Sequence, residues 1–305
     1  MITAGLAIKI AVAMMFLLGG TYVHFRGKVR HRFQRQLLDH STVMAPYNMF
    51  VYWRSAVPNT PMQDVSRFPQ LALLRDNWQT IRDEAQALYG QGMIRPSDGT
   101  NDLGFNSFFR KGWTRFYLKW YGNYLPSALQ QCPKTVELLK QTPSVKAAMF
   151  AVLNPGSELG PHRDPFAGSL RYHLGLVTPN SDACRIFVDG NMHSWRDGED
   201  VVFDETYIHW AENKTDQYRI ILFADVERPL KDRISRAINS AFARIAVASA
   251  ASRNLPGEKL GVMNHLFAYI YSIRRLGKWM KQKNKFGYYT IKYILFGALL
   301  YWIFR

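Results

Sequence analysis

An uncharged apolar run from Ile10 to Phe25 constrains this chain more than any other feature of the sequence, because a run of this length must be buried in a membrane or a protein core. The basic stretch RGKVRHRFQR at residues 26–35 follows it at once. A basic flank on that side is typical of a transmembrane helix whose C-terminal end lies in the cytoplasm. The small-residue cleavage site of a signal peptide is absent after the run. We therefore predict a retained anchor at residues 1–25.

The other end of the chain has a similar arrangement. Basic residues between Arg274 and Lys285 precede the apolar stretch FGYYTIKYILFGALLYWIF, in which Lys292 carries the charge. As a helix, this stretch is long enough to cross the hydrocarbon core of a bilayer. We predict a second transmembrane segment at residues 286–305. The positive-inside rule then places both basic flanks, and all residues between the anchors, on the cytoplasmic side.

The net charge is strongly positive, and its distribution indicates the partner. The 305 residues carry a formal charge of +16, which favours nucleic acid, an anionic membrane surface or a phosphorylated substrate. Much of this charge lies beside the two predicted anchors, so we expect contact with anionic lipid headgroups and no nucleic acid. Specific recognition of a phosphorylated lipid is a second interpretation. Cys132 and Cys184 form no CxxC pair, which fits a reducing setting.

Helical and irregular regions are expected on both sides of the middle of the chain. Residues 26–68 are basic and then irregular, with Pro46 and Pro58 as breakers. Residues 69–88 have apolar positions at spacings of three and four, which is typical of an amphipathic helix. Residues 231–285 show the same pattern with a basic character, so we expect two helices there. These helices either pack on the core or lie in the membrane interface, and the sequence favours neither.

Short apolar or alternating segments, separated by Gly, Pro, Asn and Asp turns, indicate β-strands in the middle of the chain. Many short strands without intervening helices argue for an antiparallel sandwich or barrel. The hydrophobic content of 48% is ample for one sizeable core of this kind. The segments are 147–153, 170–177, 184–188, 200–204 and 218–226.

The stretch GPHRDPF at residues 160–166 places His162 and Asp164 two positions apart between prolines. Alternating residues of an extended segment face one side, so this pair can converge on a divalent metal. His209 follows an apolar strand further along the chain. A His-x-Asp pair alone is more often a surface pair than a metal site. Two histidines and a carboxylate on a β-barrel, however, are the facial triad of non-heme Fe(II) oxygenases.

Basic residues on two predicted strands indicate a second ligand. Arg219 lies on the strand after His209, and an arginine can hold the far carboxylate of 2-oxoglutarate in bidentate fashion. In LRYHLGLV, alternation places Arg171 and His173 on one face of a strand. If that face lines the barrel interior, Arg171 needs an anion. The alternative is that both residues face solvent on the outside of a sheet.

Several motifs in one order resemble the aspartyl/asparaginyl β-hydroxylase family of Fe(II)/2-oxoglutarate dioxygenases. They run from about Phe68 to Pro229 and include LNPGSELGPHRDP, LRYHLGLVTP, SWRDGEDVVFDETYIHWAEN and RIILFADVERP. The resemblance implies a dioxygenase domain at residues 69–230. Its fold would be a mainly β catalytic core, a double-stranded β-helix of the jelly-roll or cupin type, with flanking helices and a transmembrane helix at each end of the chain.

The resemblance also implies roles for single residues. His162 and His209 match the family's two Fe(II)-binding histidines, and O₂ is the oxidant. Asp164 departs from the animal protein hydroxylases, which have glycine there, so the third iron ligand depends on the His-x-Asp pattern alone. Ala151 departs from relatives that have a serine near the co-substrate. The residues that match those around the co-substrate 2-oxoglutarate are Arg171, His173 and Arg219.

With its two apolar ends, the chain is similar to the branch of this family that hydroxylates C2 of a secondary acyl chain of lipid A, the anchor of lipopolysaccharide. This implies an oxidoreductase at the cytoplasmic face of the bacterial inner membrane, with a membrane lipid as substrate and no obligate protein partner. Hydroxylation of Asp or Asn side chains in a protein is one alternative. A non-catalytic, membrane-tethered cupin-like binding module is the other. Six aromatic residues are candidates to line an acyl-chain slot, although aromatic residues in a barrel more often belong to its core. They are Trp113, Phe116, Tyr117, Trp120, Tyr121 and Trp195.

Overall fold

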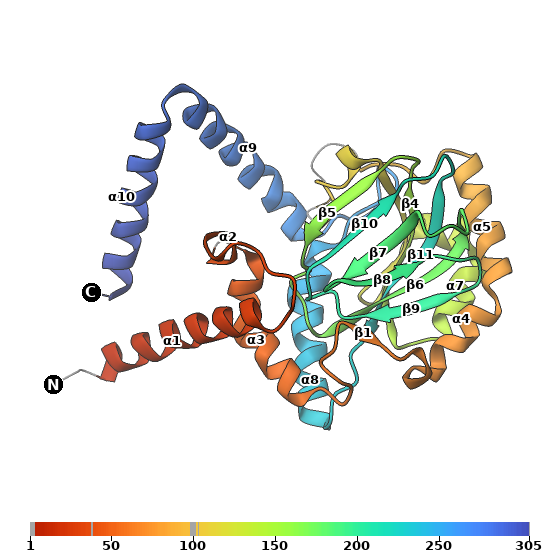
Figure 1. Ribbon diagram of the computed structural model, residues 1–305, viewed down its shortest axis with the longest axis horizontal. Coiled ribbons are helices and arrows are strands. Elements are labelled where there is room, and N and C mark those ends of the chain that lie inside the picture. Colours follow the sequence, from red (N-terminus) through yellow and green to blue (C-terminus); the bar gives the residue numbers. More distant parts are fainter. Residues whose placement is uncertain (1–3, 38, 98–101, 103, 305) are drawn as a thin grey trace.

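Two antiparallel β-sheets lie face to face in the right half of the view, with helices around them, and the helices at both ends of the chain extend away to the left (Figure 1). The structure is a computed structural model, and it describes residues 4–37, 39–97, 102 and 104–304. Within these residues, the larger sheet has the strand order β1-β9-β6-β11-β4-β2-β3 and the smaller has the order β5-β10-β7-β8. The predicted antiparallel, mainly β core is confirmed.

The strands of both sheets are short. The larger sheet consists of β1 (Met62–Gln63), β2 (Trp113–Trp120), β3 (Asn123–Tyr124), β4 (Val145–Leu153), β6 (Ser169–Val177), β9 (Asp200–Phe203) and β11 (Arg219–Glu227). The smaller sheet consists of β5 (Glu158–His162), β7 (Cys184–Val188), β8 (Asn191–Ser194) and β10 (His209–Asn213). All five strands predicted from the sequence are present, as β4, β6, β7, β9 and β11, whereas β1, β2, β3, β5, β8 and β10 were not predicted as strands.

The order of the strands is that of a jelly roll. From β4 to β11 the chain passes back and forth between the sheets, so that β11 lies between β4 and β6 while β10 lies between β5 and β7. Eight strands in two four-stranded antiparallel layers form the double-sheet jelly roll found in cupins. Side chains from the inner faces of both layers meet in the space between them.

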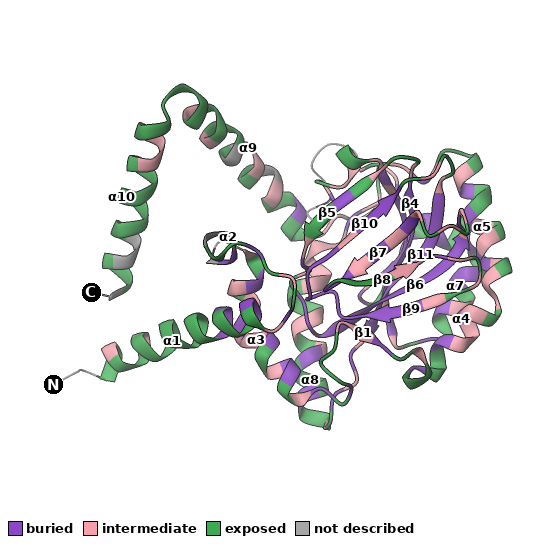
Figure 2. Ribbon diagram, in the orientation of Figure 1, coloured by how far each residue is buried: buried purple, intermediate pink, exposed green. Residues whose placement is uncertain are grey.

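The strands differ in burial, because some have both faces covered and others have one face toward water (Figure 2). Strands β4 and β6 are buried along almost their whole length, because one face lines the interior and helices cover the other. Helix α5 (Trp78–Gly90) contacts β6, and α7 (Pro133–Lys140) packs against α5 on this outer side. Strand β7 alternates between buried and partly exposed residues, as expected for a sheet with one face toward water.

The helix predicted at residues 69–88 is confirmed, with a break at Asn77. It consists of a 3-10 turn (Pro69–Leu71), α4 (Ala72–Asp76) and α5. The remaining short elements of this region are 3-10 turns at Val65–Arg67 and Phe109–Lys111 and helix α6 (Pro126–Gln131).

The segment after the first apolar run is helical, which corrects the prediction that residues 26–68 are irregular after the basic run. The apolar run itself belongs to α1 (Ala4–Phe25), and the helices that follow it are α2 (Phe33–Leu37) and α3 (His40–Arg54). Helix α3 continues through Pro46, which removes one backbone hydrogen bond. It nevertheless forms because it packs closely against α1, where the side chain of Ala45 lies next to Gly19. This packing outweighs the unfavourable effect of the proline.

The helices expected at residues 231–285 are confirmed as α8 (Arg233–Phe242) and α9 (Val262–Lys283), which are joined through a π-helical turn (Ala243–Val247) and a 3-10 turn (Ala248–Ala250). Helix α8 packs on the core through Phe242, whose ring stacks on Tyr47 at a centroid distance of 4.0 Å. Its apolar stripe, with Ile234 and Ile238, is exposed. One face of α8 thus packs on the core, and contact of its exposed face with a membrane stays a prediction.

The last helix, α10 (Lys285–Phe304), contacts α9 and is mostly exposed (Figures 1 and 2). Among the described residues, α1 is the helix that is long and apolar enough to cross a membrane, as judged by length and composition. The second transmembrane segment, at residues 286–305, stays a prediction.

Candidate metal centre

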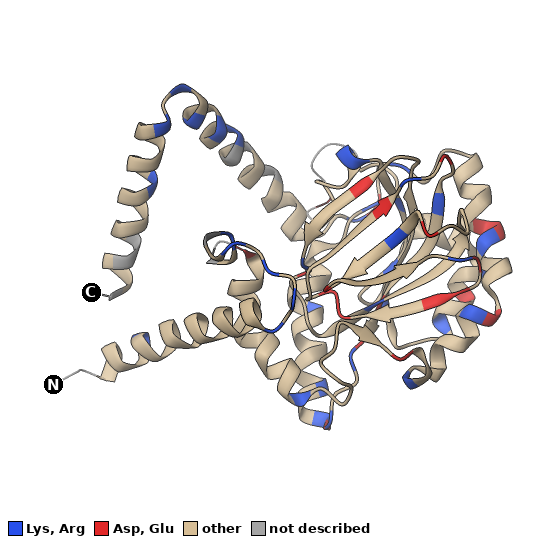
Figure 3. Ribbon diagram, viewed as in Figure 1, with Lys and Arg blue, Asp and Glu red and all other residues tan. Residues whose placement is uncertain are grey.

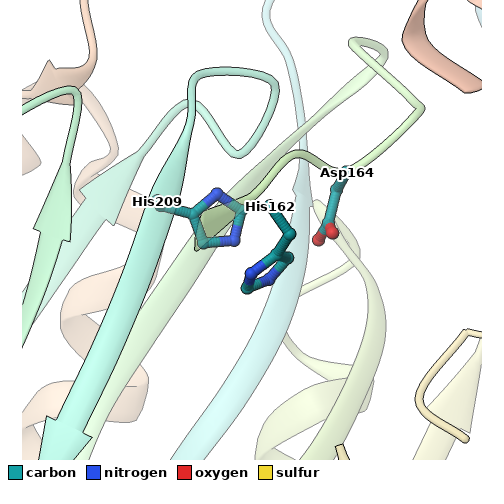
Figure 4. Close-up of side chains that lie close together, drawn as sticks. All are labelled: His162, Asp164 and His209. Carbon is teal, nitrogen blue, oxygen red and sulfur yellow. The ribbon is translucent and has the colours of Figure 1, made fainter. Parts of the chain in front are cut away.

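Three side chains that can bind a metal converge between the two sheets (Figure 4). His162 ends β5 and His209 begins β10, and the two residues are directly paired across these antiparallel strands. Asp164 lies two residues after His162, in the loop that follows β5. The potential ligand atoms of these three residues all lie within 4.8 Å of one another. The structure thus brings the predicted His-Asp-His set together.

Both histidines are held in the same tautomer by the backbone. Nδ1 of His162 donates to the carbonyl oxygen of Gly160 at 2.8 Å, and Nδ1 of His209 donates to that of Tyr207 at 3.0 Å. A carbonyl oxygen only accepts, so in each ring Nδ1 carries the proton and Nε2 keeps its lone pair. Such a bond on the other ring nitrogen is typical of histidines that bind metals.

The protonation states of the three groups suit a metal. Burial lowers the pKa of His162, and burial together with the nearby His162 lowers the pKa of His209 to about 3. Burial alone would raise the pKa of Asp164, but Arg171 and the two histidines lower it to about 2. At neutral pH the set is therefore two neutral imidazoles and one carboxylate, which are the forms that bind divalent ions.

Arg171 holds the carboxylate of this set. Its Nη2 donates to Oδ2 of Asp164 at 2.6 Å, its Nε donates to Glu205 Oε2 at 2.6 Å, and its Nη1 lies 3.0 Å from Asp225 Oδ1. Asp225 is the cross-strand partner of Arg171 in the β6–β11 ladder. Burial raises the pKa of both Glu205 and Asp225, which favours their protonated forms beside the ionised Asp164. From the resemblance we expected Arg171 to bind the co-substrate. In the structure, however, its donors already contact three acidic side chains.

Arg219 presents the opposite case. It is 2% exposed, and within the described part of the chain its guanidinium has no acidic partner. The group lies 4.2 Å from the ring centroid of Trp195, and its Nε has no hydrogen-bond partner. Burial lowers the pKa of Arg219 to about 10, so the side chain stays charged at neutral pH. A buried cation without an anion is unfavourable, so this position fits an anionic ligand.

Other polar atoms around Arg219 also lack partners among the described residues. Neither ring nitrogen of His173 is hydrogen-bonded, and the same holds for Nε1 of Trp195. Burial and the charge of Arg219 lower the pKa of His173 far below its ordinary value, so its ring is neutral. Buried polar groups are normally paired. Unpaired donors around a buried arginine, in the same cavity as the His-Asp-His set, therefore indicate a polar ligand.

The six residues singled out from the sequence all line one cavity, whose other walls are largely apolar. The alternative, in which Arg171 and His173 face solvent, is wrong, because both are buried. Of the six aromatic candidates for an acyl-chain slot, Trp113 and Trp195 line the cavity. The other four, Phe116, Tyr117, Trp120 and Tyr121, are not among its lining residues. The six residues singled out for the site are His162, Asp164, Arg171, His173, His209 and Arg219.

Sequence reasoning missed the two acidic partners of Arg171. A signal existed for Asp225, because alternation along β11 puts it on the same face as Arg219. Glu205 follows β9 in a turn and gave no periodic signal.

One cavity of this jelly roll holds both the His-Asp-His centre and Arg219, whose guanidinium has no acidic partner among the described residues. These features are those of a metal-dependent enzyme that also binds an anionic ligand. Residues 75–229 match the aspartyl/asparaginyl beta-hydroxylase family, and the chain belongs to this family. It is thereby an oxygenase of the hydroxylase type.

Individual relatives agree with this membership. The ornithine lipid ester-linked acyl 2-hydroxylase of Rhizobium tropici is 32% identical over 210 residues, which cover 68% of this chain and 72% of that protein. The human aspartyl/asparaginyl beta-hydroxylase is 30% identical over 164 residues, which cover 51% of this chain and only 21% of that protein. The solved prolyl-4-hydroxylase of Pseudomonas putida has 16% sequence identity and a TM-score of 0.35, and the alignment covers 50% of this chain and 87% of that one. The family assignment rests on the sequence matches.

Proposed function

We propose that this chain is a non-heme iron dioxygenase that uses 2-oxoglutarate and O₂ to hydroxylate C2 of a secondary acyl chain of lipid A. The observation that carries this proposal is the pairing, in one cavity, of a candidate metal centre with a buried arginine that has no acidic partner among the described residues. A metal site alone fits many enzymes. A metal site next to a free buried cation fits one that also binds an anionic co-substrate.

The side chains fit both ligands. Two neutral imidazoles and a carboxylate are the donor set of non-heme Fe(II) oxygenases. 2-Oxoglutarate is a dicarboxylate, and Arg219 can pair with its far carboxylate while the donors of His173 and Trp195 lie nearby. Bound iron would supply the oxidation of an unactivated C–H bond, which no amino-acid side chain can perform.

The chain itself orients the reactants and excludes water. Arg171 occupies one oxygen of Asp164 and so leaves the other oxygen available to a metal. The cavity walls are formed by aromatic and aliphatic side chains from both sheets. A dry, apolar wall protects a reactive centre from unwanted side reactions and suits an acyl chain. The wall residues include Phe105, Phe108, Trp113, Phe203 and Phe223.

A membrane lipid as substrate is supported from two sides. One relative that is similar over 68% of this chain is by its name a lipid acyl 2-hydroxylase. The ends of the chain also carry exposed apolar surface, on α1 and along α9 and α10, with lysines and arginines interspersed on α9 (Figures 2 and 3). Basic residues beside apolar helices bind anionic lipid surfaces. We propose that α10 is a second anchor and that the catalytic domain faces the cytoplasm at the inner membrane.

Hydroxylation of Asp or Asn side chains in a protein is the second candidate. The match to the human aspartyl/asparaginyl beta-hydroxylase favours it. The exposed apolar helices speak against it, because a soluble peptide does not need an enzyme held at a bilayer.

Mass spectrometry of lipid A from cells with and without the gene tests the proposal. We expect lipid A to gain one oxygen atom on an acyl chain when the gene is present. An unchanged lipid A, together with succinate release on a peptide substrate, would instead support the second candidate. Absence of succinate release with either substrate would identify a non-catalytic binding module.

A further inference from the structure

The end of the anchor helix is bound to the loop that leads into one candidate ligand (Figure 1). Arg26 directly follows α1, and its guanidinium donates to Thr206 Oγ1 at 2.6 Å and to Asp204 Oδ2 at 2.9 Å. The same group lies over the ring of Tyr207 at 3.9 Å. The three contacted residues immediately precede the end of the loop at His209.

Arg163 connects the other ligand-carrying loop to the same anchor. It stands between two candidate ligands in the sequence and is 2% exposed. Its Nη1 donates to the backbone oxygen of Val23, in the last turn of α1, at 3.0 Å and to Gln36 Oε1, on α2, at 3.1 Å. Its own backbone oxygen accepts a hydrogen bond from His40 Nε2 at 2.8 Å. The residue that joins the two ligands is thus fixed at both its side chain and its backbone.

The flanks of this loop are held from the same side. Asn48, on α3, donates to the backbone oxygen of Pro165 at 2.9 Å and accepts from the backbone N–H of Ala167 at 3.0 Å. Arg35, on α2, donates to the backbone oxygen of Pro161 at 3.3 Å. Prolines have no N–H to offer to a β-ladder, so this loop cannot be positioned by strand pairing alone. Side chains from the juxtamembrane helices take over that task.

We propose that six residues at the end of α1 and on the helices that follow it form a clamp, which joins the membrane anchor to both ligand-carrying loops, and that Arg163 is its positioning residue. The six are Val23, Arg26, Arg35, Gln36, His40 and Asn48. This inference deepens the proposed function and rests on it. C2 of an acyl chain lies next to the carbonyl group, at the boundary between lipid headgroup and hydrocarbon. The end of α1, where basic residues begin, lies at the same boundary if α1 crosses the membrane. The clamp therefore holds the metal centre near the depth at which that carbon is found.

The test measures metal affinity in the full-length chain in detergent micelles, without reference to turnover. Metal-free protein is titrated with Co(II), a spectroscopic substitute for Fe(II), and the visible absorption of the bound ion is recorded. The variants are Arg163→Gln and Arg163→Lys. The matched control is Arg115→Gln, because Arg115 is 1% exposed and its side chain is hydrogen-bonded to Asp102 and Ser252, which belong to neither ligand loop.

We expect Arg163→Gln to weaken Co(II) affinity about tenfold to a hundredfold, the range for residues that orient metal ligands, and to alter the absorption spectrum. Arg163→Lys should recover part of the affinity, since lysine keeps a donor. Arg115→Gln should lower the melting temperature but leave affinity and spectrum unchanged. A folded Arg163→Gln protein with unchanged affinity and spectrum overturns the inference.

A second variant, Gln36→Leu, keeps the ligand loop intact and removes an acceptor on the clamp side. Arg163 then loses one of its two acceptors, and the bonds from Gln36 to Ser41 and Thr42 of α3 are lost as well. The loss of one acceptor of Arg163 predicts a weakening of about twofold to tenfold. If Arg163→Gln does not fold, this variant decides, and an unchanged affinity then overturns the clamp. If the wild-type chain binds no Co(II), the proposed metal site is wrong and so is the clamp. If wild type and all variants bind Co(II) equally well, only the clamp is wrong.

Discussion

Arg171 donates to Oδ2 of Asp164 at 2.6 Å, and this bond joins a candidate metal ligand, which follows β5 of the smaller sheet, to an arginine on β6 of the larger sheet. Glu205 and Asp225 hold the same arginine from its other sides. Arg219, in the same cavity, has no acidic partner within the described residues. The two buried arginines therefore differ in what they can do, since one is engaged in fixing a ligand and the other is free to bind an anion.

Removing a ligand tests the metal centre. His209→Ala should abolish Fe(II) binding and turnover, because two remaining ligands cannot hold the ion. Asp164→Gly should weaken Fe(II) binding, since the carboxylate is ionised at neutral pH and lies with the two histidines. Metal content after dialysis is the measurement, and His265→Ala, an exposed residue of α9, is the control. Full activity in Asp164→Gly would reduce the centre to its two histidines.

Replacing Arg219 tests the co-substrate site. Arg219→Ala should raise the apparent constant for 2-oxoglutarate about tenfold to a hundredfold, the effect of losing a hydrogen bond to a charged group, and should leave iron bound. Arg219→Lys should recover only part, because lysine cannot bind a carboxylate in bidentate fashion. Succinate release at varied 2-oxoglutarate gives the constant. Arg185→Ala is the control, since Arg185 pairs with Glu212 on the partly exposed face of β7 and β10. An unchanged constant excludes this role.

Replacing Arg171 separates its two possible roles. Arg171→Met leaves three acidic side chains without their cation, and breaking a buried ion pair costs about 3–5 kcal/mol of unfolding free energy. We expect a clear fall in the melting temperature and weaker Fe(II) binding. In metal-saturated protein, the apparent constant for 2-oxoglutarate should change less than in Arg219→Ala. A larger change than in Arg219→Ala would restore Arg171 to the co-substrate site.

Local periodicity was enough to predict much of the site. Alternation in β6 placed Arg171 and His173 on one face, and both line the cavity. The His-x-Asp spacing placed His162 and Asp164 together, as observed. The pairing of His162 with His209 was not predictable, because it depends on the register of β5 against β10, which are polar or interrupted by Gly and Pro.

Tertiary contacts explain what the sequence did not reveal. Helix α3 continues through Pro46 because α1 packs against it, and no local rule contains that contact. The same holds for Arg163, whose partners Val23 and Gln36 lie more than a hundred positions away in the chain. Such links follow from the fold as a whole, so periodicity cannot anticipate them.

Asp204 predicts how stability depends on pH. It is fully buried between Arg228, at 2.8 Å, and Arg26, at 2.9 Å. Burial would raise the pKa of Asp204, but the two arginines outweigh it and hold the pKa well below its ordinary value. Asp204 therefore stabilises the fold fully above its unfolded-state pKa of about 4. That contribution is lost as the pH falls from there toward the folded-state pKa.

The measurement compares the melting temperatures of wild type and Asp204→Asn in metal-free protein. The difference should be large at pH 7 and should shrink as the pH falls below about 4. A difference that stays constant over this range would show that the charge of Asp204 does not contribute to stability.

The C-terminal helix provides a test of whether the substrate is a lipid. Helix α10 makes its main contacts with α9, and all six candidate site residues lie in the jelly roll or its loops. A chain that ends at Lys285 should therefore fold, bind Fe(II) and release succinate slowly without substrate. Its hydroxylation of lipid A in membranes should fall sharply, because loss of one of two anchors lets the cavity leave the surface.

The basic residues of α9 should leave some residual activity that decreases with added salt, since screening weakens their contact with anionic lipids. Lipid A that gains one oxygen atom is compared in cells that express the full-length and the shortened chain at equal abundance. Replacing Lys292 by leucine in the full-length chain is the control, because it keeps α10 and makes it more apolar. Equal hydroxylation by both chains would show that α10 does not serve access to the lipid, and would favour a soluble protein substrate.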